Sequence, residues 1–482
     1  MSATTGTLVA GIDSSTQSCK VTVRDLATGV TVREGVAPHR PETIVDPRTW
    51  WDALLLAVRR AGGLDDVAAI SVSGQQHTPV FLDSTGAVVA DSPLWNDTGS
   101  HPHMIALNDE LGRDEWIRRT GLPLTLSDTV TKVRWLRDVD PAAADRTAAV
   151  AVVHDWLTWR LRGFGGDEPG GLDQLTTDRS EASGTAYWSG ETEDYCHDLF
   201  AHAFGAAAIL PRVLGPLDVA GVTGRGIPGI PAGISVGVGS GDNAAAALAL
   251  GLAEREAVLS LGTSGVVYAR SADPVHDYAG YVCSYADATG GHLPLVATLN
   301  AARNFEVGAS LLGTSHDEFS RLALAAPPGA EGLTLLPYFE GERTPDLPHA
   351  RGSLHAASLA NLSRENFARA VIEGTLASQV AMLDALRQCS VPVDRLLLIG
   401  GAARSEAVRT ILSQLVDIPV AVPEPGEYVA MGAAMQAAST LEGAFPTWST
   451  RVDELPDLPV ERRIEQQHSA AMEALGYLAP PA

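Results

Sequence analysis

The stretch GIDSSTQS, residues 11–18, decides how the rest of this chain is interpreted. Two further glycine-rich stretches also follow apolar runs of strand length: GSGDN (residues 239–243) with SLGTSG (260–265), and LLLIGGAARS (396–405). Glycines let the backbone approach a phosphate closely and let successive N–H groups point the same way. Three such loops in this order predict one ATP site that is assembled from two half-domains.

Two carboxylates stand inside these loops, Asp13 in the first and Asp242 in the second. A carboxylate repels phosphate, so each needs another task, such as holding Mg²⁺ through its waters or taking a proton from an acceptor hydroxyl. Asp242 precedes an alanine-rich helix, and the amino end of a helix stabilises an ionised carboxylate. From the residues alone, a general base and an ordinary helix N-cap remain equally open for Asp242.

Size and composition limit the class of protein. A chain of 482 residues is too long for one core, so two domains are expected. A formal net charge of −24 argues against nucleic acid or an anionic membrane as a partner. The four cysteines are scattered without a C-x-x-C pair, and no basic segment or long apolar run marks a secretory signal or a membrane span. We expect a cytoplasmic enzyme.

The order of strand and helix signals predicts the domain organisation. The segment 221–239 is rich in glycine and proline, and after it the pattern of strand, glycine loop and strand starts again. A long helix is expected over Ser363–Arg387, and a buried strand over Leu396–Ile399. We predict an N-terminal domain over residues 1–235, a C-terminal domain over 236–450 and a peripheral helical tail over 451–482.

Other nucleotide-binding motifs are excluded. The run GRGIPG (residues 224–229) fits the dinucleotide pattern by letter, but Pro228 and Pro231 forbid the helix that would hold a pyrophosphate. No glycine is followed by lysine anywhere, which rules out a Walker A loop. The nucleotide site must therefore be built from the three loops named above.

Several short motifs, in their order and spacing, identify a family. They run from GIDSSTQSCKV at the amino end to GEYVAMGAA at residues 426–434. Between these lie SGQQH (73–77), LWND (94–97), TVTKVRWL (129–136), HDWLTWRL (154–161) and LPYFEGERTP (336–345). The chain resembles the FGGY family of carbohydrate kinases over nearly its whole length. Its catalytic scaffold is shared with hexokinase and actin.

The resemblance implies a fold and an activity. The fold is α/β, with two actin/hexokinase-like (ribonuclease H-like) domains of mixed sheets flanked by helices and the active site in the cleft between them. The activity is ATP-dependent, and within the family the chain is most similar to kinases of D-xylulose that phosphorylate its terminal hydroxyl. Alternatives are another ketose, polyol or sugar acid (ribulose, glycerol, gluconate), or a non-catalytic nucleotide switch on the same scaffold.

The resemblance also assigns roles to residues. Asp242 is the expected general base, and Asp13 with Asp242 would hold Mg²⁺ through water. The expected sugar-binding residues are Gln76, His77, Trp95, Asn96, Asp97, Asp242 and Asn243. The expected ATP-binding residues are Ser14, Ser15, Thr16, Gly262, Thr263, Ser264, Gly400, Gly401, Ala402 and Ser405. The partners would be a small sugar and ATP, without nucleic acid or membrane, and a homodimer stays open. Thr78 and Gly99 depart from the family pattern near the expected sugar pocket.

Overall fold

The computed structural model describes residues 6–165 and 170–477, and its contacts divide the chain into two compact units. The first unit contains the described residues up to Leu252, together with Ala272–Leu293 and Gly426–Ser449. The second contains Ala253–Ser271, Pro294–Pro425 and the described residues from Thr450 onwards. We expected a boundary at residue 235, whereas the structure keeps 236–252 in the first unit.

The reason for this grouping lies in two helices. Helix α9 (Asp242–Ala249) packs against α14 (Tyr428–Glu442), and α14 in turn packs on strands of the first unit. Both helices are rich in alanine, so their backbones can approach closely. A Cβ at Gly432 in α14 would lie 2.0 Å from the carbonyl oxygen of Ala245 in α9. Two segments that are far apart in the sequence thus belong to one core.

A mixed sheet forms the centre of the first unit. Its strands lie in the order β13-β14-β5-β1-β2-β3, and β15 also pairs with β5. Strands β1, β2 and β3 are antiparallel, whereas β5 runs parallel to β1, β14 and β15. The strands are β1 (Leu8–Ser14), β2 (Ser18–Asp25), β3 (Thr31–Pro38), β5 (Val67–Gly74), β13 (Val219–Val222), β14 (Ser235–Gly237) and β15 (Ser240–Gly241).

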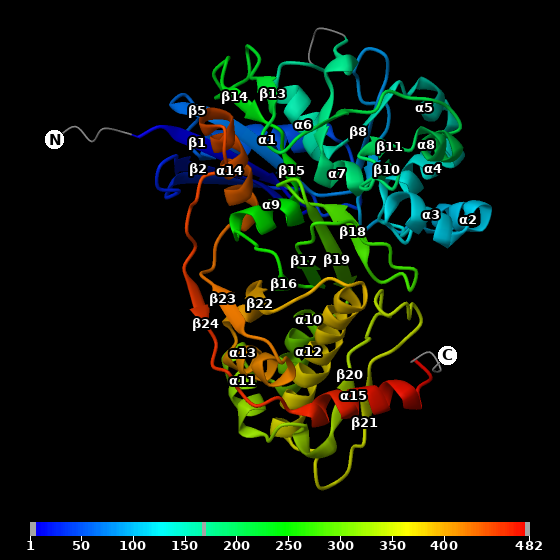
Figure 1. Cartoon of the computed structure of the whole chain (residues 1–482), viewed down its shortest axis with the longest axis vertical. Helices are drawn as coiled ribbons and strands as arrows, with labels where there is room; N and C mark the ends of the chain where they lie inside the picture. The colour runs from blue at the N-terminus through cyan, green and yellow to red at the C-terminus, as the bar shows by residue number, and fades with distance from the viewer. Residues whose placement is uncertain (1–5, 166–169, 478–482) are drawn as a thin grey trace, which may run out of the picture. The chain divides into compact units, whose positions relative to one another are not determined.

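Helices α1 (Arg48–Arg60) and α14 cover opposite faces of this sheet (Figure 1). A Cβ at Gly11 in β1 would lie 1.9 Å from a carbonyl oxygen of α14, and one at Gly35 in β3 would lie 2.1 Å from a carbonyl oxygen of α1. Gly35 pairs with Val21, which pairs with Ile12, the neighbour of Gly11. Because paired residues share a face and successive residues alternate, Gly11 and Gly35 point to opposite faces.

Smaller elements complete the first unit. Short ladders pair β4 (Ile44–Val45) with β7 (Ser92–Pro93), β6 (Pro79–Leu82) with β8 (Ala149–Val152), β9 (Thr176–Asp178) with β12 (Arg212–Leu214), and β10 (Trp188–Ser189) with β11 (Asp194–Tyr195). The remaining elements are α2 (His101–Leu111), α3 (Arg113–Thr120), α4 (Thr129–Val139), α5 (Pro141–Arg146), α6 (Val153–Leu161), η1 (Leu172–Gln174), α7 (Arg179–Ser183), α8 (His197–Phe204) and β18 (Cys283–Ala286).

The second unit repeats the strand pattern of the first. The sheet strands of this unit lie in the order β19-β17-β16-β22-β23-β24, in which β19, β17 and β16 are antiparallel and β22 runs parallel to β16 and β23. In each unit, a glycine-rich or serine-rich turn joins the first two antiparallel strands. The strands are β16 (Glu256–Leu261), β17 (Gly265–Ala269), β19 (His292–Thr298), β22 (Arg395–Ile399), β23 (Val420–Pro423) and β24 (Val452–Glu454), and a separate ladder pairs β20 (Thr334–Leu336) with β21 (Ser353–His355).

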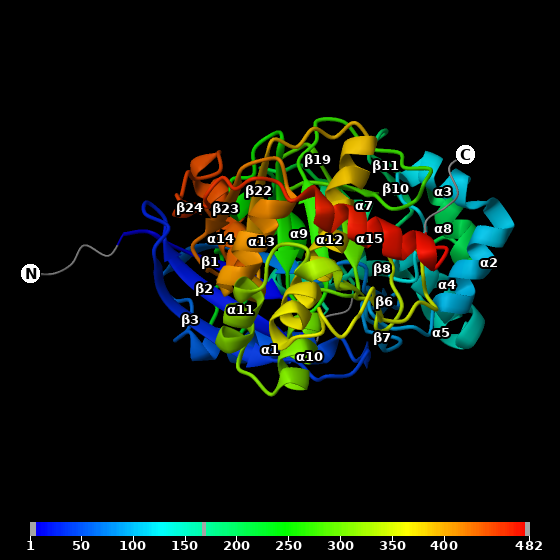
Figure 2. The ribbon, with the colours of Figure 1, turned by 90° about the horizontal axis from the view of Figure 1, so that it is seen from below.

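The long helix expected from the sequence is α12 (Arg364–Gln388), and it begins where the sequence predicted. Ser363 is its N-cap, and the Ser363 side chain accepts a hydrogen bond from the backbone N–H of Asn366. Figures 1 and 2 both show α15 (Arg462–Ala474) alongside α12. The other helices of this unit are α10 (Arg303–Leu312), α11 (His316–Ala325), η2 (Ala330–Gly332), η3 (Gly401–Arg404), α13 (Glu406–Leu415) and α15 (Arg462–Ala474).

Two α/β units with mixed sheets flanked by helices confirm the predicted fold class. In the described part of the chain, no helix combines the length and the apolar character that crossing a membrane requires.

Candidate active site

Three strands of the first unit end side by side and carry residues that the sequence singled out. Strand β5 pairs in parallel with β1 and with β15, so that Ser14 and Gly241 are both partners of Gly74. Carboxyl ends of parallel strands meet at one edge of a sheet, where open α/β sheets bind their ligands. Asp13, the residues after Gly74 and Asp242 therefore share one edge of this sheet.

Asp13 is buried, with 8% of its surface exposed. Burial raises the pKa of its carboxyl group to about 7. A hydrogen bond from Ser15 and the positive charge of Lys20 lower this pKa, whereas the negative charge of Asp242 raises it. The two carboxylates are thus close enough to interact. Each would be more readily ionised if a cation stood beside them.

Asp242 is the first residue of α9, and Gly241 occupies the N-cap position. The sequence left two roles open for Asp242, general base and helix N-cap. Because Gly241 is the N-cap, Asp242 does not have that role. The Asp242 Oδ1 atom accepts hydrogen bonds from the backbone N–H of Asn243 at 2.7 Å and from its side-chain Nδ2 at 3.0 Å. Burial raises the pKa of Asp242 to about 6, and the backbone hydrogen bonds oppose this shift. A carboxylate with a pKa in this range is ionised at neutral pH and is a stronger base than an ordinary one.

Gln76 and His77 follow β5 and are held by the segment after β9. The Nε2 atom of Gln76 donates to the carbonyl oxygen of Ser180 at 3.2 Å, and His77 Nδ1 lies 2.7 Å from the carbonyl oxygen of Gly184. A Cβ at Gly241 would lie 2.7 Å from the Gln76 side chain, which places Gln76 directly beside the residue before Asp242. His77 has a φ of 70°, a conformation that L residues rarely adopt and that is often found at functional sites.

The segment that contains Trp95, Asn96 and Asp97 lies beside the first glycine-rich loop. Trp95 Nε1 donates to Thr16 Oγ1 at 2.8 Å. Asp97 is buried, its Oδ2 accepts a hydrogen bond from Thr43 Oγ1 at 2.7 Å, and its Oδ1 accepts one from a backbone N–H at 2.8 Å. Asn96 is exposed. The carboxylate of Asp97 thus shapes its own loop, whereas the side chain of Asn96 faces solvent.

In the second unit, two of the predicted ATP loops lie next to each other. Gly262, Thr263 and Ser264 form the turn between β16 and β17, and Gly262 N donates to the carbonyl oxygen of Ser264 at 3.1 Å. Gly400 follows β22 with a φ of 93°, and a Cβ there would lie 2.5 Å from the carbonyl oxygen of Leu261. Glycine is therefore required at residue 400, because the two loops touch through their backbones.

The other residues of the third loop differ in their surroundings: Gly401 has open space beside its backbone, whereas Ser405 caps a helix. A Cβ at Gly401 would meet nothing within 4 Å, so a ligand could approach this residue. Ala402 lies in the single turn η3. Ser405 is the N-cap of α13, and its hydroxyl accepts from Val408 N at 3.4 Å and donates to Ser320 Oγ at 3.2 Å. The hydroxyl of Ser405 therefore has a structural role in this unit.

A cluster of buried polar residues close to Asp242 is absent from the residues predicted from the sequence. Asp178 and Glu181 at the start of α7 are buried, and His154 at the start of α6 lies 3.0 Å from Asp155 Oδ1 and 4.0 Å from Asp178 Oδ1. Burial raises the pKa of Glu181 well above its ordinary value, and the charge of Asp242 adds to this shift. The run TDRSEAS, residues 177–183, could have pointed to it, since an Asp two residues before a Ser and three before a Glu caps a helix.

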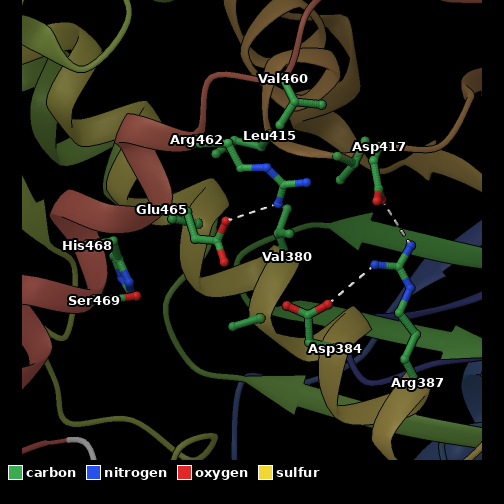
Figure 3. Close-up of a pocket in the computed structure, with 13 residues that line it drawn as sticks. Val380, Asp384, Arg387, Leu415, Asp417, Val460, Arg462, Glu465, His468 and Ser469 are labelled. Carbon is green, nitrogen blue, oxygen red and sulfur yellow. Dashed lines mark hydrogen bonds and ion pairs between the residues drawn. The ribbon is translucent and has the colours of Figure 1, made fainter.

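A cavity of about 250 Å³ lies in the second unit between α12, α15 and the end of α13 (Figure 3). Its charged side chains pair with one another: Arg387 contacts Asp384 at 3.3 Å and Asp417 at 3.4 Å, and Arg462 contacts Glu465 at 3.6 Å. No residue that the sequence predicted for sugar or ATP binding lines this cavity. The predicted site residues gather instead at the sheet edges described above.

Known proteins resemble this chain over its whole length. Residues 8–249 match the N-terminal domain of the FGGY family of carbohydrate kinases, and residues 257–441 match its C-terminal domain. The xylulose kinase of Streptomyces coelicolor is 41% identical, with 100% of this chain and 98% of that protein covered. The crystal structure of xylulose kinase from Bifidobacterium adolescentis matches with a TM-score of 0.90 and 42% identity, covering 97% of this chain and 99% of that one.

The same fold extends to more distant proteins. Plasmodium falciparum glycerol kinase matches with a TM-score of 0.85 at 18% identity, covering 99% of each chain. At this identity the match concerns the fold alone. The two family domains and the full-length relatives show that this chain belongs to the FGGY family of carbohydrate kinases.

Proposed function

We propose that this chain catalyses the ATP-dependent phosphorylation of D-xylulose at its terminal hydroxyl, giving D-xylulose 5-phosphate and ADP. The observation that carries the proposal is the 41% identity to the Streptomyces coelicolor xylulose kinase over 100% of the chain. The fold match to the Bifidobacterium adolescentis xylulose kinase at 42% identity supports it. The local geometry of the first unit supports the proposed roles of Asp242 as the base and of Gln76 and His77 in sugar binding.

Asp242 is the proposed general base. Both hydrogen bonds from Asn243 go to Oδ1, which fixes the carboxylate plane and leaves Oδ2 to face the sugar. Oδ2 takes the proton from the terminal hydroxyl as its oxygen attacks the γ-phosphorus of ATP, and it later releases that proton to solvent. The raised pKa of this carboxyl group, about 6, supports proton acceptance near neutral pH.

Gln76 and His77 are proposed to bind the sugar hydroxyls. Donation from Gln76 Nε2 to a backbone carbonyl fixes the amide and leaves Oε1 as an acceptor for a hydroxyl. Contact between His77 Nδ1 and the Gly184 carbonyl orients the ring beside Gln76. Trp95, Asn96, Asp97 and Asn243 stay part of the proposed sugar site, with Trp95 and Asp97 acting mainly through the shape of their loop.

The carboxylates of Asp13 and Asp242 fit a Mg²⁺ ion that is held partly through water. Oxygen donors from one or two carboxylates, completed by water and phosphate, are the usual set for this cation. When bound, Mg²⁺ neutralises charge that develops on the phosphates. Burial and, to a lesser extent, the charge of Asp242 raise the pKa of Asp13, and a cation held by these residues would favour its ionised form.

The ATP phosphates are proposed to lie against three loops. Backbone N–H groups at residues 14–16, at 262–264 and at 400–402 would donate to phosphate oxygens. The open space at Gly401 supports this proposal for the third loop. Ser405 would assist by holding the start of α13, which its hydroxyl already caps.

The setting of the enzyme follows from its chemistry. We propose that the enzyme acts in the cytoplasm, where ATP is available, and that its ligands are small molecules. The net charge of −24 supports the absence of a nucleic acid partner. That the chain forms a homodimer is a prediction. Light scattering of the purified protein tests it by measuring the molar mass in solution.

The identity of the product tests the proposal most simply. The protein is incubated with ATP, Mg²⁺ and D-xylulose, and the product is examined by ³¹P and ¹³C nuclear magnetic resonance. We expect a phosphomonoester on carbon 5 together with one equivalent of ADP. ADP release without a sugar phosphate would favour the nucleotide-switch alternative, and a phosphate on a different carbon would contradict the proposed orientation of the sugar.

A further inference from the structure

Ser180 and Gly184, at the two ends of one short segment, receive contacts from several parts of the proposed sugar site. The Ser180 carbonyl accepts from Gln76, the Gly184 carbonyl lies at hydrogen-bonding distance from His77, and the Ser180 hydroxyl accepts from the backbone N–H of Gly241 at 2.9 Å. Gly241 is the residue before Asp242. One short segment thus connects the proposed base to the residues proposed to bind the sugar.

The Ser180 hydroxyl is itself held in place by a hydrogen bond to the carboxyl group of Asp178. It donates to Asp178 Oδ2 at 2.6 Å, and the same oxygen accepts from the Ser180 backbone N–H at 2.8 Å. Both residues are buried, and Ser180 has no exposed surface. Because its proton is directed to Asp178, the hydroxyl presents a lone pair to Gly241 N–H. A hydrogen bond donated on one side of a hydroxyl strengthens the bond that it accepts on the other, as in other hydrogen-bond chains.

We propose that Ser180 is a positioning residue, which through Gly241 N–H fixes the carboxylate of Asp242 at the distance and angle that proton transfer needs. This rests on the proposed function of Asp242. Ser180 does not itself touch the reacting atoms. Small displacements of a reacting group, of about 1 Å, can cost roughly 100-fold in rate. The loss of this hydroxyl should therefore act on turnover and much less on binding.

The binding residues should be spared because they use the backbone of this segment. Gln76 and His77 both contact carbonyl oxygens, which remain whatever the side chain at residue 180. The Ser180→Ala variant should therefore lower kcat by roughly 10- to 100-fold, while the KM for the sugar changes by less than about threefold and the KM for ATP stays the same.

Ser183 offers a matched control on the same helix. It is also a buried serine, its hydroxyl accepts from Ala286 N at 2.9 Å, and it donates to the Ser180 carbonyl at 2.8 Å. Ser183→Ala removes the same chemical group from the same helix but leaves the bond to Gly241. We expect this variant to keep kcat within about twofold of wild type, with a loss of thermal stability similar to that of Ser180→Ala.

The decisive experiment is a double-mutant cycle between Ser180→Ala and Asp242→Asn, assayed with the sugar that gives the highest kcat/KM. If Ser180 acts through the Asp242 carboxylate, Ser180→Ala should cost little further rate once Asp242 is Asn. If its 10- to 100-fold loss persists in that background, or if Ser180→Ala matches Ser183→Ala in kcat, the inference is wrong.

The cycle also separates this inference from the proposed function. Near-wild-type turnover of Asp242→Asn alone would overturn the proposed base, whatever the serine variants do. If Ser180→Ala does not fold, Ser180→Cys against Ser183→Cys replaces it, because a thiol of similar shape is a weak acceptor. Equal kcat values for those two folded variants would contradict the role of Ser180, and a selective loss at residue 180 would support it.

Discussion

Asp13 and Asp242 lie at the ends of two strands that both pair with β5, and the negative charge of Asp242 raises the pKa of Asp13. The sequence places these residues more than 200 positions apart. Strand pairing brings them to one edge of the first unit's sheet. Two interacting carboxylates at such an edge are a suitable arrangement for one proton acceptor and one Mg²⁺ ion, and this leads to the predictions below.

Replacing Asp242 by Asn removes the proton acceptor and keeps the shape. We expect kcat to fall by ~10²–10⁴-fold, the usual loss for a general base, and the sugar KM to stay within about tenfold. Steady-state kinetics with a coupled ADP assay measures both. Asp173→Asn, at an exposed position in the same unit, is the control and should behave as wild type. Unimpaired turnover of Asp242→Asn would show that another group takes the proton.

Asp13→Ala should impair turnover and weaken the response to Mg²⁺, because the metal neutralises charge that develops on the phosphates. The measurement is a Mg²⁺ titration of kcat at fixed ATP. We expect a higher Mg²⁺ concentration at half-maximal rate than in wild type, whereas Asp65→Ala, at an exposed turn, should leave the titration unchanged. A titration curve and turnover identical to wild type would make Asp13 an ordinary buried residue of β1.

His77→Ala should raise the sugar KM far more than the ATP KM. Leaving a sugar hydroxyl, or the buried protein group that would bind it, without a hydrogen bond costs about 1–3 kcal/mol. This corresponds to roughly 5- to 150-fold in affinity. Initial rates at varied sugar and varied ATP separate the two constants. His101→Ala, at an exposed residue of α2, is the matched control. If His77→Ala and His101→Ala have equal effects on the sugar KM, His77 is not part of the sugar site.

The stability of the second unit should depend on pH through His468. Burial lowers the pKa of this histidine to about 4, from 6.5 in an exposed state, and its Nε2 lies 3.1 Å from Ser378 Oγ. Between these two values the unfolded chain binds more protons than the folded chain. The contribution of His468 to stability is therefore complete above pH 6.5 and falls as the pH drops towards 4, at most by about 1.4 kcal/mol per pH unit.

The difference in unfolding free energy between wild type and His468→Gln isolates this contribution, because the carboxyl and guanidinium groups of Glu465, Asp384, Arg387 and Arg462 around the cavity remain in both (Figure 3). We expect wild type to lose stability relative to His468→Gln as the pH falls from about 6.5 to 4.5. His316→Gln, at an exposed position of α11, should give a flat difference. A flat curve for His468→Gln as well would show that its proton binding does not change on folding.

Local signals made much of the fold predictable. The helix predicted over Ser363–Arg387 and the strand predicted over Leu396–Ile399 match α12 and β22 within one residue at each end. The repeated order of strands and glycine loops predicted that the second half echoes the first, and the resemblance to the FGGY family implied the two mixed sheets. The assignment of α14 to the first unit was not predictable, because it depends on close packing of this helix on Gly11, far away in the sequence.

In the candidate site too, some residues were predictable from the local sequence and others were not. The residues on loops after strands, such as Asp13 and Asp242, carry a local signal of glycine and carboxylate. The contacts of Ser180 with Gly241 and Gln76 join segments that are 61 and 104 residues apart, and nothing in the neighbouring sequence announces them. Long-range hydrogen bonds of this kind were visible only in the folded chain.

The measurement that tests the central claim most directly is kcat/KM for a panel of acceptors: D-xylulose, D-ribulose, glycerol and gluconate, each with ATP and Mg²⁺. Glycerol has too few hydroxyls to satisfy the proposed sugar pocket, and each unsatisfied contact should cost roughly 5- to 150-fold. Thr78 and Gly99, which depart from the family pattern, make this comparison necessary. We predict the highest kcat/KM for D-xylulose. A higher value for any other member of the panel would contradict the proposed substrate, and no ADP release with any of them would contradict the proposed activity.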